Sequence, residues 1–100
     1  MMIIIVTNHA LKRLSERSGL SKTAAMRMAE KAYLNGIQHG ETKGNLNKWV
    51  TSLYFVNRRA NNIRLYGDKA FIFADNVLIT VLQVPSNLVK EVKRLKNSRN

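Results

Sequence analysis

The residues best suited to chemistry lie near the start of the chain, where His9, Arg13 and Arg17 recur at intervals of four. In a helix each such interval turns by about 40°, so the three side chains share one stripe. A histidine with two arginines beside it could transfer a proton next to groups that hold a phosphate. A solvated basic face is the alternative interpretation of this stripe.

The second histidine, His39, lies in a segment, 37–45, that contains two glycines. There it is either a solvent-facing residue or a mobile second catalytic group. The chain has no cysteine, which excludes a thiolate nucleophile and a cysteine-bound zinc ion. With two histidines and six acidic residues, we expect no closed metal site and no cofactor.

Cleavage of RNA requires no metal. The 2′-hydroxyl must lose a proton, the charge at phosphorus must be stabilised, and the leaving 5′-oxygen must gain a proton. One histidine with several arginines and lysines can supply these functions, and the composition of this chain permits that chemistry.

The chain is strongly basic: 17 Lys and Arg oppose 6 Asp and Glu, giving a net charge of +11 at pH 7 over 100 residues. Such an excess predicts a polyanionic partner, most commonly nucleic acid. Hydrophobic residues make up 45% of the chain, which is typical of a globular protein. We therefore expect one domain over residues 1–100 that binds RNA or another nucleic acid.

No targeting signal is evident. The apolar start, Met1–Val6, is short and lacks the charged residues and cleavage site of a signal peptide. No apolar run approaches the roughly 18 residues of a membrane span. We expect a cytoplasmic protein without a membrane partner.

The first half of the chain predicts helices. Residues 1–7 form a possible strand or arm, and one helix is expected from the Thr7–Asn8 cap to Gly19. A second helix is expected from Ser21 to Gly36, followed by a loop over 37–45. The apolar spacing from Leu46 to Tyr54 predicts a third helix, although 46–57 is also rich in strand-forming residues.

The second half predicts an antiparallel meander of strands at 62–66, 69–74 and 77–84, joined by two-residue turns. Pro85 ends the sheet and a basic helix follows, with 96–100 expected to fray. The predicted fold class is α+β, with N-terminal helices packed on a three- to four-stranded antiparallel sheet and a C-terminal basic helix.

Two-residue turns fix the register of the strands, and the register assigns each side chain to one of the two faces of the sheet. One face is wholly aliphatic and is expected to lie under the N-terminal helices; it comprises Ile63, Leu65, Ala70, Ile72, Ala74, Val77, Ile79 and Val81. Across the other face runs the row Arg64, Phe71 and Thr80, suited to contact phosphate, base and sugar. Alternatively the C-terminal helix covers Phe71, Phe73 and Leu82, and Arg64 lies at the edge.

The pattern His9-Ala10-x-x-Arg13-x-x-x-Arg17, the Gly-ended helix, the basic loop and the strand 77–81 resemble a known group of proteins. They are similar to small bacterial and phage members of the ribonuclease-toxin superfamily that includes barnase, EndoU, colicin and RelE types. The resemblance implies helices before a curved antiparallel sheet whose open face cuts RNA. It also implies that His9 and Arg13 carry the helix motif and Thr80 the last-strand motif.

We therefore expect a nucleic-acid-binding protein that is a metal-independent endoribonuclease of toxin type, with an acidic antitoxin as a possible partner. The alternative is a non-catalytic phage or mobile-element factor that binds nucleic acid, a nuclease or a ribonucleoprotein complex. The expected catalytic residues, which converge with Arg17 on one groove, are His9, Arg13, Arg64 and Thr80. The expected nucleic-acid-binding residues are Arg17, Lys43, Arg58, Arg59, Tyr66, Lys69 and Phe71.

Overall fold

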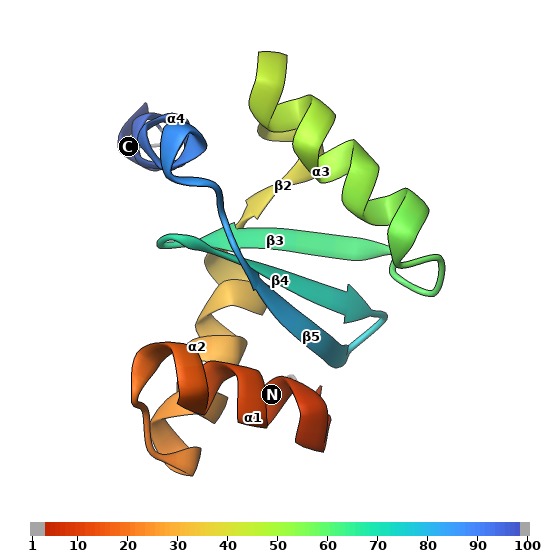
Figure 1. The fold of residues 1–100 in the computed structure, drawn as a ribbon, viewed down its shortest axis with the longest axis vertical. Coiled ribbons are helices and arrows are strands. Elements are labelled where there is room, and N and C mark those ends of the chain that lie inside the picture. Colours follow the sequence, from red (N-terminus) through yellow and green to blue (C-terminus); the bar gives the residue numbers. More distant parts are fainter. Residues whose placement is uncertain (1–3, 99–100) are drawn as a thin grey trace.

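A twisted β-sheet lies between two pairs of helices (Figure 1). The computed structural model describes residues 4–98, without the side chains of Arg17 and Ser18. The sheet has five strands in the order β1-β5-β4-β3-β2: β1 (Ile5–Val6), β2 (Ile37–Gln38), β3 (Asn62–Tyr66), β4 (Lys69–Ala74) and β5 (Val77–Gln83). The helices are α1 (Asn8–Ser18), α2 (Lys22–Asn35), the short 3₁₀ helix η1 (His39–Glu41), α3 (Gly44–Val56) and α4 (Ser86–Ser98).

The first two helices begin and end where the capping residues predict. The Thr7 hydroxyl accepts a hydrogen bond from the Ala10 backbone at 3.1 Å, and the Ser21 hydroxyl accepts one from Ala24 at 3.2 Å. Gly19 ends α1 in the left-handed conformation, with φ of 64°. The fold class is α+β, as predicted.

Local details of the prediction need correction. The expected loop over 37–45 contains β2 and η1. The strand β2 has only two residues, which is too short for an alternation of apolar and polar residues to be recognised in the sequence. The segment around 46–57 is a helix, which removes the strand alternative. The helix α4 continues to Ser98, so residues 96–98 are not frayed; residues 99 and 100 lie outside the described part. The strand β1 runs parallel to β5, which makes the sheet mixed instead of antiparallel, and with β2 the sheet has five strands instead of the predicted three to four.

A β-bulge changes the predicted register of the last strand pair. The β3–β4 ladder is as expected, with Arg64 opposite Phe71. In β5, Leu78 lies opposite Phe73 and Thr80 opposite Ile72, so Ile79 is an extra residue. Beyond the bulge Phe71 pairs with Val81, and the row predicted from Arg64 through Phe71 to Thr80 is wrong.

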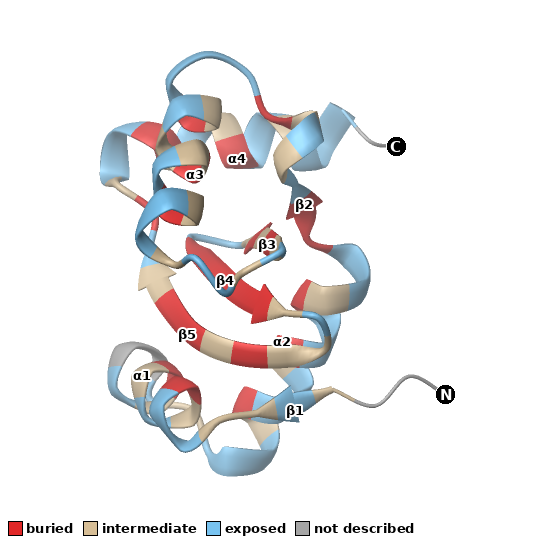
Figure 2. Ribbon diagram, turned by 90° about the vertical axis from the view of Figure 1, so that its right-hand side faces the viewer, coloured by how far each residue is buried: buried red, intermediate tan, exposed pale blue. Residues whose placement is uncertain are grey.

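The sheet buries side chains on both faces, which Figure 2 shows as buried strands between the helix pairs. Ile63, Leu65 and Ile72 form one core with residues of α3 and α4. The opposite core joins α1 and α2 to the second face of the sheet through Phe71, Phe73, Leu78 and Val81. The aliphatic face therefore lies under α3 and α4, not under the N-terminal helices, and Val81 belongs to the other face.

Side-chain size explains which helices cover which face. The inner surfaces of α1 and α2 carry small residues, including Ala10, Ala25, Ala29 and Ala32. These leave room for two phenylalanine rings, and Tyr33 packs edge-on against Phe73 with ring centres 5.0 Å apart. The alternative in which the C-terminal helix covers Phe71 and Phe73 is wrong, although Leu82 does pack in the core that α4 shares.

Removal of buried volume at Ile72 tests this core. Ile72 is 0% exposed, so Ile72→Ala should lower the free energy of unfolding by about 2–5 kcal/mol through lost burial and a residual cavity. The matched control Ile5→Ala, on a half-exposed side chain, should change it by no more than about 0.5 kcal/mol. Urea unfolding of both variants measures the difference, and equal losses would contradict the described burial.

Candidate nucleic-acid-binding site

Arg64 fastens α2 to the sheet. Its Nη1 donates a hydrogen bond to the Gly36 carbonyl at 2.9 Å, and its Nε donates to Asn62 Oδ1 at 2.9 Å. A Cβ at Gly36 would lie 2.7 Å from the Cβ of Arg64, so only glycine allows this close approach. The bond from Nη1 therefore holds the end of α2 against β3, and the bond from Nε orients the guanidinium within β3.

The start of α1 lies against the bulge of β5. The Thr7 backbone donates to the Leu78 carbonyl at 3.2 Å, and the Thr7 hydroxyl donates to the Ile79 carbonyl at 3.1 Å. These bonds place the first turn of α1, with the exposed His9, beside β5, whereas the side chain of Thr80 is buried.

The predicted five-residue groove does not form as a whole. Arg64 pairs with Phe71 on the α1–α2 face, whereas Thr80 pairs with Ile72 on the α3–α4 face. Directly paired residues share a face, so Arg64 and Thr80 point to opposite sides of the sheet. Arg13 is partly buried one turn beyond His9 in α1, and the side chain of Arg17 lies outside the described part.

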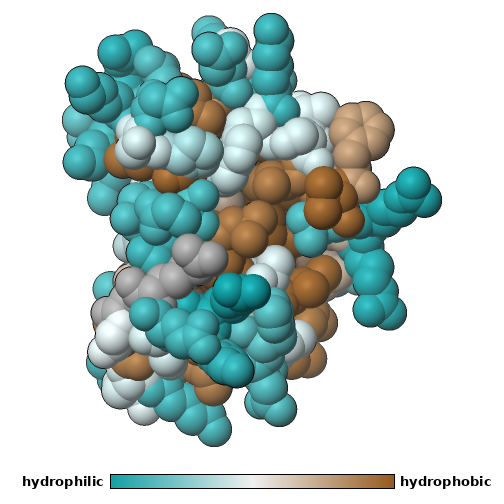
Figure 3. Space-filling model, viewed as in Figure 1, coloured by the Kyte–Doolittle hydropathy of each residue, from teal (hydrophilic) through white to brown (hydrophobic). Residues whose placement is uncertain are grey.

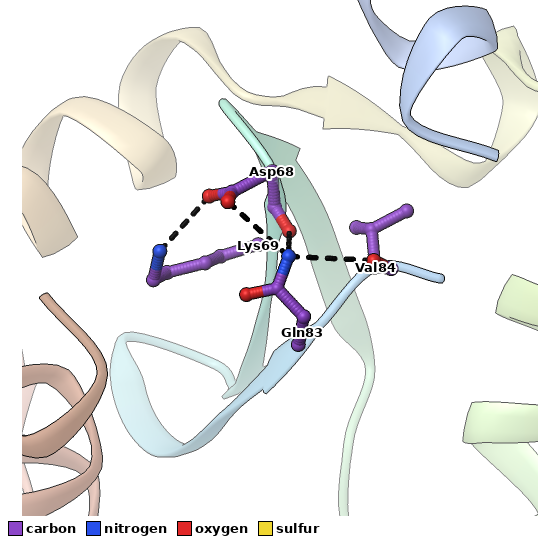
Figure 4. Close-up of polar contacts among 4 residues, drawn as sticks. All are labelled: Asp68, Lys69, Gln83 and Val84. Atoms are coloured by element: carbon purple, nitrogen blue, oxygen red, sulfur yellow. Dashed lines mark hydrogen bonds and ion pairs between the residues drawn. The ribbon is translucent and has the colours of Figure 1, made fainter. Parts of the chain in front are cut away.

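Two of the expected nucleic-acid-binding residues are buried. Phe71 is 0% exposed in the core under α1 and α2, so its predicted stacking on a base is wrong. The side chain of Lys69 is 11% exposed, and its amine lies 2.9 Å from Asp68 Oδ1. Figure 4 shows Gln83 contacting the same carboxylate from β5, with Nε2 3.2 Å from Oδ2.

The other expected nucleic-acid-binding residues lie in separate regions: Arg58 with Arg59, Tyr66, and Lys43. Arg58 and Arg59 are exposed between α3 and β3, whereas Tyr66 ends β3, so the length of that strand separates them. On the face shown in Figure 3, hydrophilic side chains cover the region of α4 and apolar side chains gather toward α3. Lys43 lines a separate hollow, shared with Glu91 of α4.

A groove runs around the end of the sheet where β3 turns into β4. It consists of three adjoining hollows, and we call it the Tyr66 groove. The hollow between β3 and α4, of about 410 Å³, is lined by Asn35, Ile37, Leu65, Tyr66, Gly67, Val92, Lys93 and Lys96. The hollow along α2, of about 390 Å³, shares Tyr66 with the first. The hollow at the turn, of about 570 Å³, shares Gly67 and Lys93 with it.

The Tyr66 groove is basic. Its lining includes four cationic side chains, from α2 and from α4: Arg27, Lys31, Lys93 and Lys96. Asp68 is the one carboxylate among these lining residues, and Lys69 binds it. The Lys96 amine also lies 5.9 Å from the centre of the Tyr66 ring, within the range of a cation–π contact.

Tyr66 is among the residues expected from the sequence to bind nucleic acid, whereas the four cations of this groove are not. The spacing of these cations is visible in the sequence: Arg27 and Lys31 are four residues apart and lie beside the alanine stripe of α2. Likewise Lys93 and Lys96 border the buried Val92 of α4. Which helix edges would meet at one end of the sheet depends on helix packing, and spacing within one helix does not contain that information.

The lysine neighbour changes the titration of Asp68. The hydrogen bond from Lys69 lowers the pKa of this carboxyl below its ordinary value of 3.8. Partial burial of the carboxyl raises the pKa, but the hydrogen bond from Gln83 lowers it again, so the net shift is downward. The Asp68 backbone carbonyl also accepts a bond from the Val84 amide at 2.9 Å. The turn is thereby joined to the end of β5.

His39 is held in place and is not the mobile catalytic group considered above. Its Nε2 lies 2.8 Å from Thr51 Oγ1, and the Thr51 hydroxyl donates its single proton to the Asn47 carbonyl at 2.8 Å. Nε2 of His39 therefore carries the hydrogen and donates. The ring also packs against Tyr54, whose hydroxyl accepts a bond from the Ile63 backbone at the edge of β3.

No family model, curated protein or solved structure matches this chain. Within the described residues, no three His, Cys, Asp or Glu side chains are grouped so as to hold a metal ion. None of the described helices has the length and apolar character needed to cross a membrane.

Acid titration tests the Lys69–Asp68 contact. The carboxyl carbon of Asp68, followed by NMR, should titrate below pH 3.8, and Lys69→Met should raise that midpoint. Because the folded pKa is the lower one, this contact stabilises the protein above pH 3.8, and the stabilisation is lost as the pH falls through the folded pKa. A midpoint at or above 3.8 in the unchanged protein would refute the contact.

Proposed function

We propose that this protein binds nucleic acid in the Tyr66 groove. The observation that carries the proposal is the meeting of four cationic side chains from two helices around one half-buried tyrosine. Lysine and arginine neutralise phosphates, and an aromatic ring stacks on a base of any identity. A groove that offers both suits a nucleic-acid strand better than it suits a simple anion.

The charge of the whole chain supports the same proposal. A net charge of +11 attracts a polyanion over long distances and raises the rate of encounter. Within the groove the single carboxylate of Asp68 is engaged by the Lys69 amine, which weakens its repulsion of a phosphate. The groove is therefore electrostatically suited to a phosphate backbone along its length.

Salt dependence measures this binding. The affinity for a labelled single-stranded oligonucleotide should fall steeply with salt because bound phosphates release counterions. Lys93→Gln and Lys96→Gln should each weaken binding and reduce the slope of log K against log salt by about 0.7. Lys90→Gln is the matched control, since Lys90 is exposed on the same helix and lines none of the three hollows.

Fluorescence anisotropy at several salt concentrations gives these slopes. Affinity that does not change with salt would count against phosphate recognition. Equal losses from Lys90→Gln and Lys93→Gln would show that the charge acts only as a diffuse field and not through the groove.

We propose, second, that RNA is cleaved without a metal at the edge formed by α1 and β5. The observation favouring it is the pair of bonds from Thr7 to β5, which holds the first turn of α1, with the exposed His9, against that strand. The buried Thr80 points to the opposite face of the sheet and has no part in this candidate. The 2′-oxygen would attack phosphorus and the bond to the 5′-oxygen would break, leaving a cyclic phosphate and a 5′-hydroxyl. His9 would accept the proton of the 2′-hydroxyl and donate it to the leaving 5′-oxygen, with Arg13 one turn away near the phosphate. The resemblance to ribonuclease toxins supports this candidate.

Cleavage of labelled RNA in the presence of a chelator tests the second function. His9→Ala should lower the rate by about 10²–10⁴-fold, because a proton-transfer group is lost. Its melting temperature should stay unchanged, since the side chain is exposed. A DNA strand of the same sequence lacks the 2′-hydroxyl and should stay intact; its cleavage, or full activity of His9→Ala, would exclude this mechanism.

A further inference from the structure

The hollow between β3 and α4 has both apolar walls and a charged rim. Its floor includes Ile37, Leu65 and Val92, which belong to the core under α3 and α4 and are each exposed by at most 2%, so the accessible apolar surface comes mainly from the other lining residues. The ring of Tyr66 forms a wall, and Lys93 and Lys96 contribute two ammonium groups. Because core packing holds the apolar floor, the hollow exists before any ligand arrives.

We infer that this hollow takes one unstacked nucleobase of a single strand, with the adjacent phosphate bound by Lys93 and Lys96; the inference rests on the function proposed above. Its volume of about 410 Å³ is in the range of small-molecule sites. A flat apolar ring fits the walls, and an anion fits the two lysines. A nucleotide combines these two groups in one ligand.

The contact between Lys96 and Tyr66 marks where the base stacks. The Lys96 amine lies 5.9 Å from the centre of the Tyr66 ring and so occupies a face of that ring. An incoming base has the greater area for stacking on the ring, while the amine gains a phosphate as its new partner. Binding thus exchanges one cation–π contact for a stacked base and an ion pair.

The lining of the neighbouring hollows favours a nucleic-acid strand over a ligand that carries charge at one end only. Tyr66 also lines the hollow along α2, where Arg27 and Lys31 lie, and Lys93 also lines the hollow at the turn. Cations therefore continue from the base hollow into the hollow along α2, as a chain with a phosphate at every unit requires, while Lys93 is shared with the hollow at the turn. A fatty acid would need only one of these cationic regions.

The base hollow also selects single strands. In a duplex each base is paired and stacked, and its flat faces are unavailable to a tyrosine ring. Only a strand with unstacked bases can place one on the ring of Tyr66 in this hollow. The full-length protein should therefore prefer a single strand to the duplex of the same sequence.

Abasic strands test the inference directly. Two labelled ten-nucleotide strands of equal charge, one normal and one abasic throughout, are compared by fluorescence anisotropy. The normal strand should bind the unchanged protein at least about fivefold more tightly, because base–aromatic stacking is lost in the other. Tyr66→Leu should abolish that preference, and Tyr66→Phe, which keeps the ring, should retain it.

The outcomes separate this inference from the proposed function. Equal, salt-dependent binding of both strands would overturn the base hollow and leave nucleic-acid binding intact, whereas no binding of either strand would overturn both. If Tyr66→Leu fails to fold, NMR of the unchanged protein gives a second test. The ring protons of Tyr66 should shift upfield with the normal strand only; no shift with either strand, or displacement of the normal strand by a fatty acid, would overturn the inference.

Discussion

One extra residue in β5 determines how the layers of this protein fit together. Because Ile79 is bulged, Leu78 and Val81 both lie under α1 and α2, beside Phe71 and Phe73. The bulge disturbs the ladder of hydrogen bonds, and the Ile79 carbonyl instead accepts the Thr7 hydroxyl that also caps α1. The position of the first helix and the composition of the aromatic core therefore depend on the same local irregularity.

Helices pack on both faces of the sheet, and this restricts where a ligand can bind. The described strands have α1 and α2 on one side and α3 and α4 on the other, and the central side chains of β4 are buried. An open, ligand-binding sheet face of the kind the resemblance implies is thus absent from the middle of β4. What stays accessible is the end of the sheet, where Gly67 makes the turn with φ of 63° and Tyr66 meets α2 and α4.

The two candidate regions differ in how they are built. The Tyr66 groove is preorganised, because core residues form its walls and the contacts among Asp68, Lys69 and Gln83 fix the turn. The edge at α1 and β5 is fixed through the backbone by Thr7, while His9 itself projects from the first helical turn. Binding can therefore depend on the groove and chemistry on the edge, and variants in one region need not affect the other.

The sequence by itself determined the helices, the meander and the turns, because caps such as Thr7 and Ser21 and apolar periodicity act over a few residues. It also determined the strongly basic net charge, which predicts a nucleic-acid partner. Only the tertiary structure decided the bulge at Ile79, the pairing of β2, and the placement of Arg27 and Lys93 in two hollows that share Tyr66. These depend on how side chains of distant segments fit against each other, a constraint that no local spacing records.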